Sequence, residues 1–127
     1  MPNVNFDNRT IKQLLEERLY PPETVFVDIQ RGALLERNDV GYKPENMRAT
    51  LGIDNRIVWK NNDLVMHTVS SSDNQQYYNE YTYQFESGFI EPNDTYEYTF
   101  IEAGEYPYHC DIHPWMRGTV TIMEGFS

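Results

Sequence analysis

The residues best suited to chemistry in this chain lie together on one short stretch near the carboxyl end, Gly104 to Gly118. It contains Cys110, the sole cysteine of the chain, followed at intervals of three residues by His113 and Met116. A thiolate, an imidazole and a thioether suit copper, whereas magnesium and calcium prefer oxygen ligands. A blue-copper site needs two imidazoles and one thiolate in a plane, with a weak axial methionine. The stretch therefore supplies such a site except for one histidine.

The second imidazole must come from His67 or His109, because the chain has three histidines. The run from Tyr106 to Cys110 is typical of a strand, and successive side chains on a strand point to opposite faces. His109 and Cys110 therefore cannot easily reach one metal. We expect His67 to be the second ligand, and His109 to point away from the metal and form hydrogen bonds within the fold or to solvent.

Two segments resemble the cupredoxins, the blue copper proteins, and are closest to single-domain members of the amicyanin and plastocyanin kind. One is Ala-Gly-Glu-Tyr-Pro-Tyr-His-Cys, residues 103–110, with the His-Pro-Trp-Met-Arg-Gly that starts at His113. The other is Val-Trp-Lys-Asn-Asn-Asp, residues 58–63, which leads to His67. The resemblance covers roughly the second half of the chain. It implies one copper ion per chain, cycling between Cu(I) and Cu(II), with His67, Cys110, His113 and Met116 as its ligands.

The family resemblance also implies a function. We expect a type 1 copper protein that carries single electrons between redox partner proteins, which dock near His113 and Trp115. His113 is the expected electron port, within an apolar patch made partly by Pro114, Trp115 and Met116. The family location is extracytoplasmic, either periplasmic or at the cell surface, although no signal peptide opens this sequence. The alternatives are a copper enzyme that acts on nitric oxide or nitrite at an open site, and a copper carriage or storage protein.

Several details of the site stay open in the sequence. Met66 is a conceivable replacement for Met116 as the axial ligand. Ile112 stands where the resembling proteins have a proline before the second copper histidine, which leaves the tightness of the loop open. We expect the amide that follows Cys110, and other amides nearby, to donate to the sulfur. We expect Asn61 either to brace the two copper loops or to serve a turn. A zinc site would call for more cysteine or histidine ligands, and a nucleophilic cysteine for an open cleft.

Composition limits the remaining classes of function. The chain has 127 residues, enough for one domain, and its formal charge of −10 argues against nucleic acid and anionic membrane surfaces as partners. The same charge favours basic or mixed-charge redox partners, with encounter rates that fall as salt rises. The sequence has no apolar run long enough for a membrane span. We expect an amino-terminal extension, residues 1–22, and a cupredoxin domain, residues 23–127.

Short strands separated by turns predict a sandwich or a barrel. The resemblance implies which of the two: an all-β fold, a Greek-key β-sandwich of the cupredoxin kind, here with a short amino-terminal amphipathic helix. Thr10 and Gln13 have the spacing of a capping box, and the prolines at 21–22 end the helical pattern. We expect this helix to pack on the outside of the sandwich, with partner docking as its alternative role. Alternation predicts strands near residues 25–30, 47–53, 56–60, 81–85, 96–100, 106–110 and 118–123. Aromatic rings of the segment Tyr77–Phe85 are expected to cover a core edge, with substrate lining or electron relay as the alternative.

Overall fold

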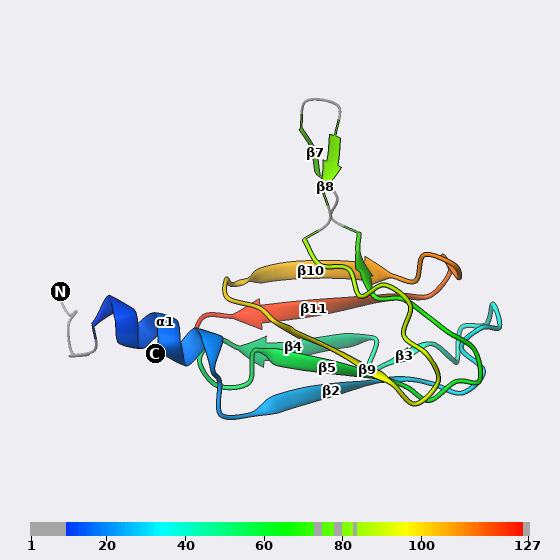
Figure 1. The fold of residues 1–127 in the computed structure, drawn as a ribbon, viewed down its shortest axis with the longest axis horizontal. Coiled ribbons are helices and arrows are strands. Elements are labelled where there is room, and N and C mark those ends of the chain that lie inside the picture. The colour runs from blue at the N-terminus through cyan, green and yellow to red at the C-terminus, as the bar shows by residue number, and fades with distance from the viewer. Residues whose placement is uncertain (1–9, 73–74, 78–79, 83, 126–127) are drawn as a thin grey trace.

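The computed structural model describes residues 10–72, 75–77, 80–82 and 84–125. Within these residues two four-stranded sheets pack face to face, one short helix precedes them, and a two-stranded hairpin projects from one side (Figure 1). The elements are α1 (Ile11–Leu19), β2 (Thr24–Ile29), β3 (Tyr42–Lys43), β4 (Asn46–Thr50), β5 (Arg56–Asn61), β6 (Ser70–Ser71), β7 (Gln75–Tyr77), β8 (Glu80–Thr82), β9 (Thr95–Thr99), β10 (Gly104–His109) and β11 (Arg117–Met123). The predicted all-β sandwich with a leading helix is confirmed.

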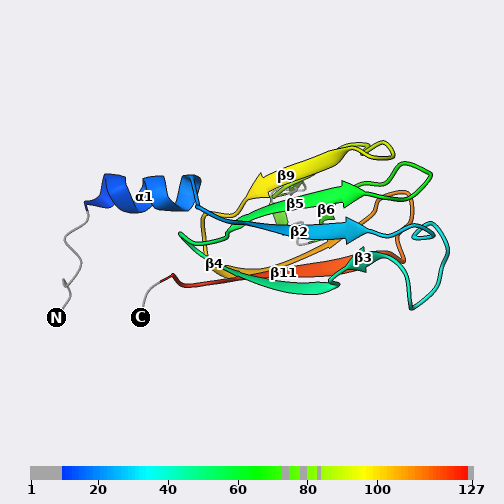
Figure 2. The ribbon, with the colours of Figure 1, turned by 90° about the horizontal axis from the view of Figure 1, so that it is seen from below.

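The chain crosses repeatedly between the two sheets. One sheet has the strand order β3-β2-β5-β9 and the other β4-β11-β10-β6. Each contains one parallel pair, β2 with β5 and β11 with β4, and the remaining pairs are antiparallel. Strands β5 and β10 lie in different sheets but run in the same direction, so the loops that follow them emerge at the same end of the sandwich, the right-hand end in Figures 1 and 2. These are the two loops that carry the predicted metal ligands.

The core follows the alternation of the sequence, because every second side chain of a strand faces the opposite sheet. Trp59 on β5 and Tyr108 on β10 are fully buried, and their ring centroids lie 5.4 Å apart across the sandwich. Most apolar residues that alternate along the predicted strands are also buried, whereas Val25 is only partly buried. The buried ones are Val27, Ile29, Met47, Ala49, Leu51, Ile57, Val120 and Ile122. Ile53 is an exception, since β4 ends at Thr50 and a turn leaves Ile53 46% exposed. The prediction that this strand continues to residue 53 is wrong.

The helix α1 begins with the predicted capping box. The Gln13 amide donates to the Thr10 hydroxyl over 3.1 Å, and the Thr10 amide donates to the Gln13 side chain over 2.8 Å. The prediction that the helix packs on the sandwich is wrong, because none of its residues is buried and Ile11 is 77% exposed. Only its last turn is anchored, where Asn55 donates to the Arg18 carbonyl over 2.7 Å. The earlier turns extend beyond the end of the sheets (Figure 2).

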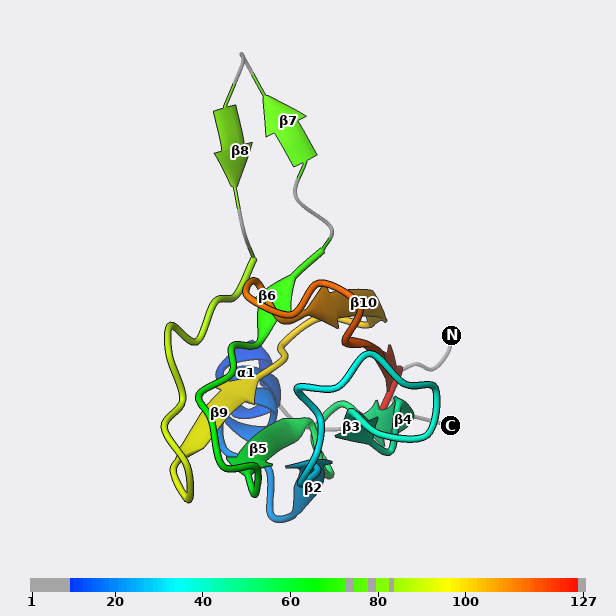
Figure 3. The same ribbon diagram turned by 90° about the vertical axis from the view of Figure 1, so that its right-hand side faces the viewer.

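The aromatic segment is divided between the hairpin and the core. Strands β7 and β8 pair antiparallel and project from the sandwich beyond β6 (Figure 3). Tyr81 lies in β8 and Tyr83 falls outside the described residues, so the ring covering predicted for them stays a prediction. Phe85 lies in the core beside Trp59, with ring centroids 6.3 Å apart. No helix in the described part of the chain is long and apolar enough to cross a membrane.

Candidate metal centre

Three side chains from the two loops converge at the end of the sandwich. His67, Cys110 and His113 each present one donor atom, and the three atoms lie within 4.8 Å of one another. Cys110 Sγ is 3.7 Å from His67 Nδ1 and 3.5 Å from His113 Nδ1, and the two nitrogens are 3.1 Å apart. Metal bonds of about 2.0–2.3 Å to nitrogen and sulfur place donor atoms at roughly such separations around one ion. The triangle is therefore of the right size for a single metal.

The methionine of the same loop completes the donor set. Met116 is 2% exposed, whereas Met66 is 38% exposed, so Met116 is the thioether held in the interior at this end. The loop closes on itself, because the Met116 amide donates to the His113 carbonyl and the Cys110 amide donates to the Met116 carbonyl. Two imidazoles, one thiolate and one thioether are the ligands of a blue-copper centre and match neither an oxygen-loving cation nor a closed zinc site. These residues are arranged as a type 1 copper site.

The orientation of His67 is set by a carboxylate that the sequence reasoning missed. His67 is fully buried, and its Nε2 lies 2.7 Å from Asp63 Oδ2, so a proton on Nε2 leaves Nδ1 to face Cys110. This arrangement of carboxylate and histidine is a common support for metal ligands. Its signal in the sequence is an acidic residue four positions before a candidate ligand.

Asp63 is itself held by the backbone. Its carboxylate accepts from the amides of Gly32, at 2.9 Å, and Leu64, at 2.8 Å, and from that of Leu34 at 3.2 Å. Burial alone would raise the pKa of Asp63, but the amides of Gly32 and Leu64 and the His67 ring outweigh it and lower the pKa below its usual value. The ionised carboxylate thus joins the loop after β2 to the first metal histidine.

The sulfur of Cys110 receives a hydrogen bond from the other loop. The Thr68 amide donates to Sγ over 3.3 Å, and the Asp111 amide donates to the Thr68 hydroxyl over 2.8 Å. The prediction that the amide after Cys110 reaches the sulfur is wrong, because the Thr68 hydroxyl accepts from that amide. The prediction that another nearby amide donates to the sulfur is confirmed by Thr68. Burial raises the pKa of the Cys110 thiol, but the His67 ring and nearby amides outweigh it, so the pKa is lowered overall. The thiolate, which is the form that binds metals, is thereby favoured.

The surroundings shift the pKa values of the two clustered histidines, His67 and His113, in opposite directions. Burial lowers the pKa of His67, but Cys110 and Asp63 more than compensate, and its pKa is raised. Burial and then the neighbouring His67 lower the pKa of His113. The lowered pKa of His113 favours its neutral ring, which has a nitrogen lone pair free for a metal.

His109 and Asn61 have supporting contacts. His109 points away from the cluster, as predicted: its Nδ1 lies 2.6 Å from Ser72 Oγ and its Nε2 3.0 Å from Asp111 Oδ1. The Asn61 side chain donates to the carbonyls of Val65 and Ile90, both at 2.9 Å. It therefore braces the loop before His67 rather than the loop of Cys110. The link between the two ligand loops is made by Thr68.

The rim of the site is partly apolar. Trp115 is 39% exposed and its ring lies beside His113, with centroids 5.4 Å apart. Pro114 is also exposed, but Met116 is buried, so the prediction that Met116 contributes to a surface patch is wrong. Ile112 on the same loop is 43% exposed and Leu64 on the other ligand loop is 66% exposed. The His113 ring thus reaches the surface among exposed apolar side chains.

Comparison with known proteins agrees with this geometry. The family model described as "Cupredoxin-like domain" matches residues 16–122. Amicyanin from Paracoccus denitrificans is 48% identical over 33 residues, and the match spans 26% of this chain and 25% of that protein. A purple cupredoxin from Nitrosopumilus maritimus has a TM-score of 0.67 at 28% identity, covering 77% of this chain and 98% of its own.

Two further solved structures share the fold. A Cu(I) form of an amicyanin variant has a TM-score of 0.61 at 24% identity and covers 84% of this chain and 88% of its own. A copper-containing nitrite reductase from Thermus scotoductus has the same TM-score and identity, and the similarity covers 84% of this chain but 24% of the reductase. At this identity both show the fold alone.

Proposed function

The chain belongs to the cupredoxin-like family, and on that premise we propose that it binds one copper ion and carries single electrons between redox partner proteins. His67, Cys110 and His113 are the equatorial ligands in this proposal, and Met116 is the axial one. The observation that carries it is the triangle of Sγ and two Nδ1 atoms, 3.1–3.7 Å on its sides, at the surface end of a closed sandwich. When bound there, copper supplies a one-electron couple and a strong thiolate absorption.

The surrounding residues hold the ligands so that little has to move during electron transfer. Asp63 fixes the ring of His67, and the Thr68 amide fixes the sulfur of Cys110. Because Asp63 is itself held by backbone amides and Thr68 donates from the backbone, the fold sets the ligand positions, and we expect them to change little between the two oxidation states. The buried Cys110 and His67 exclude water from the inner side of the site.

Electrons leave through His113 in this proposal, because it is the ligand whose ring reaches the surface. Trp115 lies beside it and gives a partner an apolar surface to contact. We place the protein outside the cytoplasm, periplasmic or at the cell surface, as part of the same proposal; the family and the absence of a membrane-spanning helix among the described residues are compatible with this location.

The metal assignment is tested by removing the thiol. Copper should bind at one ion per chain with an intense visible band, and Cys110→Ala should abolish that band because the chain has one cysteine. Ser72→Ala is the control, since it removes a hydrogen bond from His109 and touches no ligand. A visible band that survives in Cys110→Ala would overturn the assignment.

The carrier role is tested at the rim. Trp115→Glu should slow electron exchange with a redox partner while the visible spectrum stays nearly unchanged, because Trp115 lies beside His113 without being a ligand. Phe89→Glu is a matched control, since Phe89 is 63% exposed and lies on neither ligand loop. If exchange is as fast in Trp115→Glu as in Phe89→Glu, the port is elsewhere.

The rival function is an enzyme that reacts with nitric oxide or nitrite at an open metal position. Azide and nitric oxide titrations of the cupric protein, followed by absorption and spin resonance, separate the two. A carrier with a shielded site leaves both spectra unperturbed at saturating ligand. Bleaching by nitric oxide, with nitrite formed in proportion to the copper reduced, would replace the carrier proposal by the enzyme.

A further inference from the structure

The turn that leads into β9 contains a sequence pattern for covalent modification. Residues 93–95 read Asn-Asp-Thr, an asparagine followed two positions later by threonine with no proline between them, which is the acceptor pattern for an N-linked glycan. The same pattern occurs at residues 8–10, Asn-Arg-Thr, where the asparagine lies outside the described residues. A bulky, hydrated glycan fits only where the asparagine side chain is free and faces solvent. The structure therefore decides whether Asn93 can serve as an acceptor.

Asn93 occupies a tight turn that is held by the backbone. The Asp94 amide donates to the Glu91 carbonyl over 3.0 Å, and Asn93 has a φ of 74°. Proline followed by asparagine suits such a turn, because Pro92 presets its own φ and asparagine tolerates a positive one. Asn61, at the end of β5, fixes the turn to the sheet: its carbonyl accepts from the Asn93 amide over 2.7 Å, and its amide donates to the Asp94 carbonyl over 2.9 Å. These contacts use main-chain atoms, so they leave the Asn93 side chain free.

The side chains of the acceptor pattern face solvent. Asn93 and Thr95 are both exposed, and neither side chain forms a hydrogen bond among the described residues. Two other asparagines, Asn55 and Asn61, are fully buried, and each of their side-chain amides donates to two carbonyls. Neither of these two is followed two positions later by serine or threonine. The buried asparagines thus stabilise the fold, whereas Asn93 combines the acceptor pattern with a free amide.

We propose that Asn93 carries an N-linked glycan, which a transferase delivers from a lipid-linked oligosaccharide. In this transfer Asn93 Nδ2 forms a bond to the anomeric carbon of the first sugar, and the bond from that carbon to the phosphate oxygen of the lipid carrier breaks. The lipid phosphate leaves with the electron pair, and Nδ2 gives up one proton to a base of the transferase. The inference rests on the extracytoplasmic location in the proposed function, because such transfer takes place on the outer side of a membrane.

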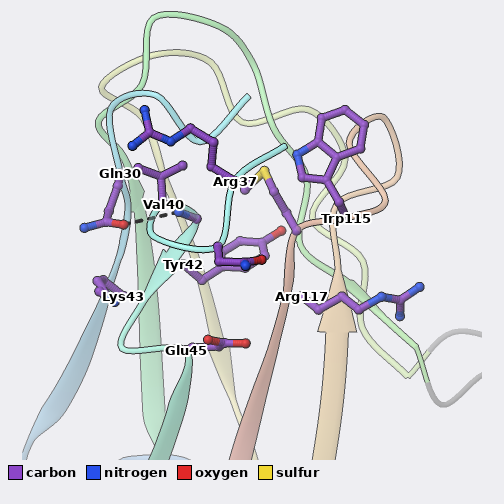
Figure 4. A pocket seen from close by; sticks show the side chains of 11 residues that line it. Gln30, Arg37, Val40, Tyr42, Lys43, Glu45, Trp115 and Arg117 are labelled. Carbon is purple, nitrogen blue, oxygen red and sulfur yellow. Dashed lines mark hydrogen bonds between the residues drawn. The ribbon is translucent and has the colours of Figure 1, made fainter. Parts of the chain in front are cut away.

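The glycan stands at the end of the sandwich that carries the ligand loops, but away from the proposed electron port. The turn before β9 lies at the same end as these loops (Figures 1 and 2). Seen end on, it lies at the corner beside β5 and β9, whereas the loop between β10 and β11 lies above, beside β10 (Figure 3). Trp115 on that loop borders a hollow that Arg37 and Lys43 also line (Figure 4), and Asn93 does not line this hollow. The Trp115 side therefore stays open to a partner.

Mass spectrometry of the protein purified from the cells that make it tests the proposal. The peptide that contains Asn93 should be heavier than its sequence by the mass of a saccharide, and electron-transfer fragmentation should locate the excess mass on Asn93. Thr95→Val keeps a β-branched side chain in β9 but removes the hydroxyl of the pattern, so it should lower the glycosylated fraction at least tenfold. Thr95→Ser keeps the hydroxyl and should stay glycosylated.

The control variant removes the other pattern. Thr10→Asp destroys the pattern at residues 8–10 and retains a residue type that caps helices well. It should leave the glycosylated fraction at Asn93 unchanged. Thermal unfolding of each variant checks that it is folded, so that a lost glycan is not the result of a misfolded chain.

Three results would overturn the glycan: an unmodified Asn93, excess mass on Asn8 alone, or equal modification of wild type and Thr95→Val. Cell fractionation separates the causes of an unmodified Asn93. If the protein lies in the cytoplasm, the proposed location fails together with the glycan; if it lies outside the cytoplasm, the glycan alone fails. If the glycan is found but copper gives no visible band, the proposed function fails while the modification site stands.

Discussion

Replacing Asp63 with asparagine tests how firmly His67 is aimed at the metal. Asp63 accepts four hydrogen bonds in the structure: Gly32 and Leu64 donate to Oδ1, and Leu34 and the His67 ring to Oδ2. Asparagine has nearly the same shape but only one oxygen acceptor. If its oxygen keeps the two backbone amides at Oδ1, its amino group faces the His67 ring. That ring must then accept at Nε2 and carry its proton on Nδ1, the atom that faces Cys110.

The size of the effect follows from these contacts. Hydrogen bonds to a charged group contribute roughly 1.5–3 kcal/mol each, and a buried group left without its partner costs about 1–3 kcal/mol. The His67 contact is fully buried, whereas Leu34 lies in a partly exposed loop where water can replace the lost acceptor. We therefore expect Asp63→Asn to lower the free energy of unfolding of the metal-free protein by about 2–3 kcal/mol. At roughly 4 °C per kcal/mol for a chain of this size, Tm falls by about 8–12 °C.

Metal affinity should fall as well, because the wrong tautomer of His67 blocks the donor atom. Loss of a hydrogen-bond partner behind a ligating histidine typically reduces metal affinity by roughly 10–100-fold. Competition against a chelator measures this loss independently of stability. The visible band should remain once copper is saturating, since Cys110 still supplies the thiolate.

The stability difference should depend on pH in a defined direction. The folded-state pKa of Asp63 is lower than its unfolded value of about 3.9, so its contribution is present above about pH 4 and is lost as the pH falls through the folded pKa. Asp63 also raises the pKa of His67, and that contribution is present below the unfolded histidine pKa of about 6.5 and is lost as the pH rises through the folded pKa. The gap between wild type and Asp63→Asn should therefore be largest from about pH 5 to pH 6 and narrow both below about pH 4 and above about pH 6.5. A gap that widens below pH 4 would contradict this sign.

Urea unfolding of metal-free protein is the assay, and Asp94→Asn is the matched control because Asp94 is exposed and its carboxylate supports no ligand. The control should unfold like wild type. If Asp63→Asn also lies within about 0.5 kcal/mol of wild type, the usual range for surface substitutions, and binds copper equally well, then Asp63 does not position His67.

Three further predictions concern the thioether, the core and the spare histidine. Met116→Leu should keep copper but shift its potential and spectrum, whereas Met66→Leu should change neither; voltammetry giving the opposite result would make Met66 the axial ligand. Gly118→Ala places a methyl group in steric conflict with Cζ and the hydroxyl of the buried Tyr108, so urea unfolding should show a loss of about 1–3 kcal/mol; wild-type stability would mean that the ring can move aside. His109→Gln should keep the visible band and cost roughly 1 kcal/mol of stability, whereas a lost band would make His109 a ligand.

The convergence of the ligands could be predicted because it depends on short-range patterns. Cys110, His113 and Met116 are six residues apart at most, so one loop fixes their proximity. The choice of His67 over His109 needed only the alternation of a strand, and His109 does point away to Ser72 and Asp111. The main strands followed from the same alternation, since the inward positions of β2, β5 and β11 are the buried ones, whereas the choice of a sandwich over a barrel rested on the family resemblance.

What could not be predicted depends on contacts between distant segments. The role of Asp63 requires the amides of Gly32 and Leu34, about thirty residues earlier, to meet the carboxylate. The hydroxyl of Thr68 takes the Asp111 amide, and neither residue indicates the other in the sequence. The exposed face of α1 had the ordinary pattern of a packed helix. Its anchoring through Asn55 at the sheet end, which leaves that face uncovered, is a property of the assembled fold.

The net charge of the whole chain and the local charges at the rim of the site act on a partner at different distances. The formal charge of −10 acts on a partner at long range and favours basic or mixed-charge surfaces during encounter. At physiological salt this influence is screened beyond about 8 Å, so final contact is governed by local charges. Locally, Lys43 and Arg117 lie beside the rim where Trp115 is exposed. Rising salt should therefore weaken the long-range preference for basic partners more than it weakens the final contact at the rim.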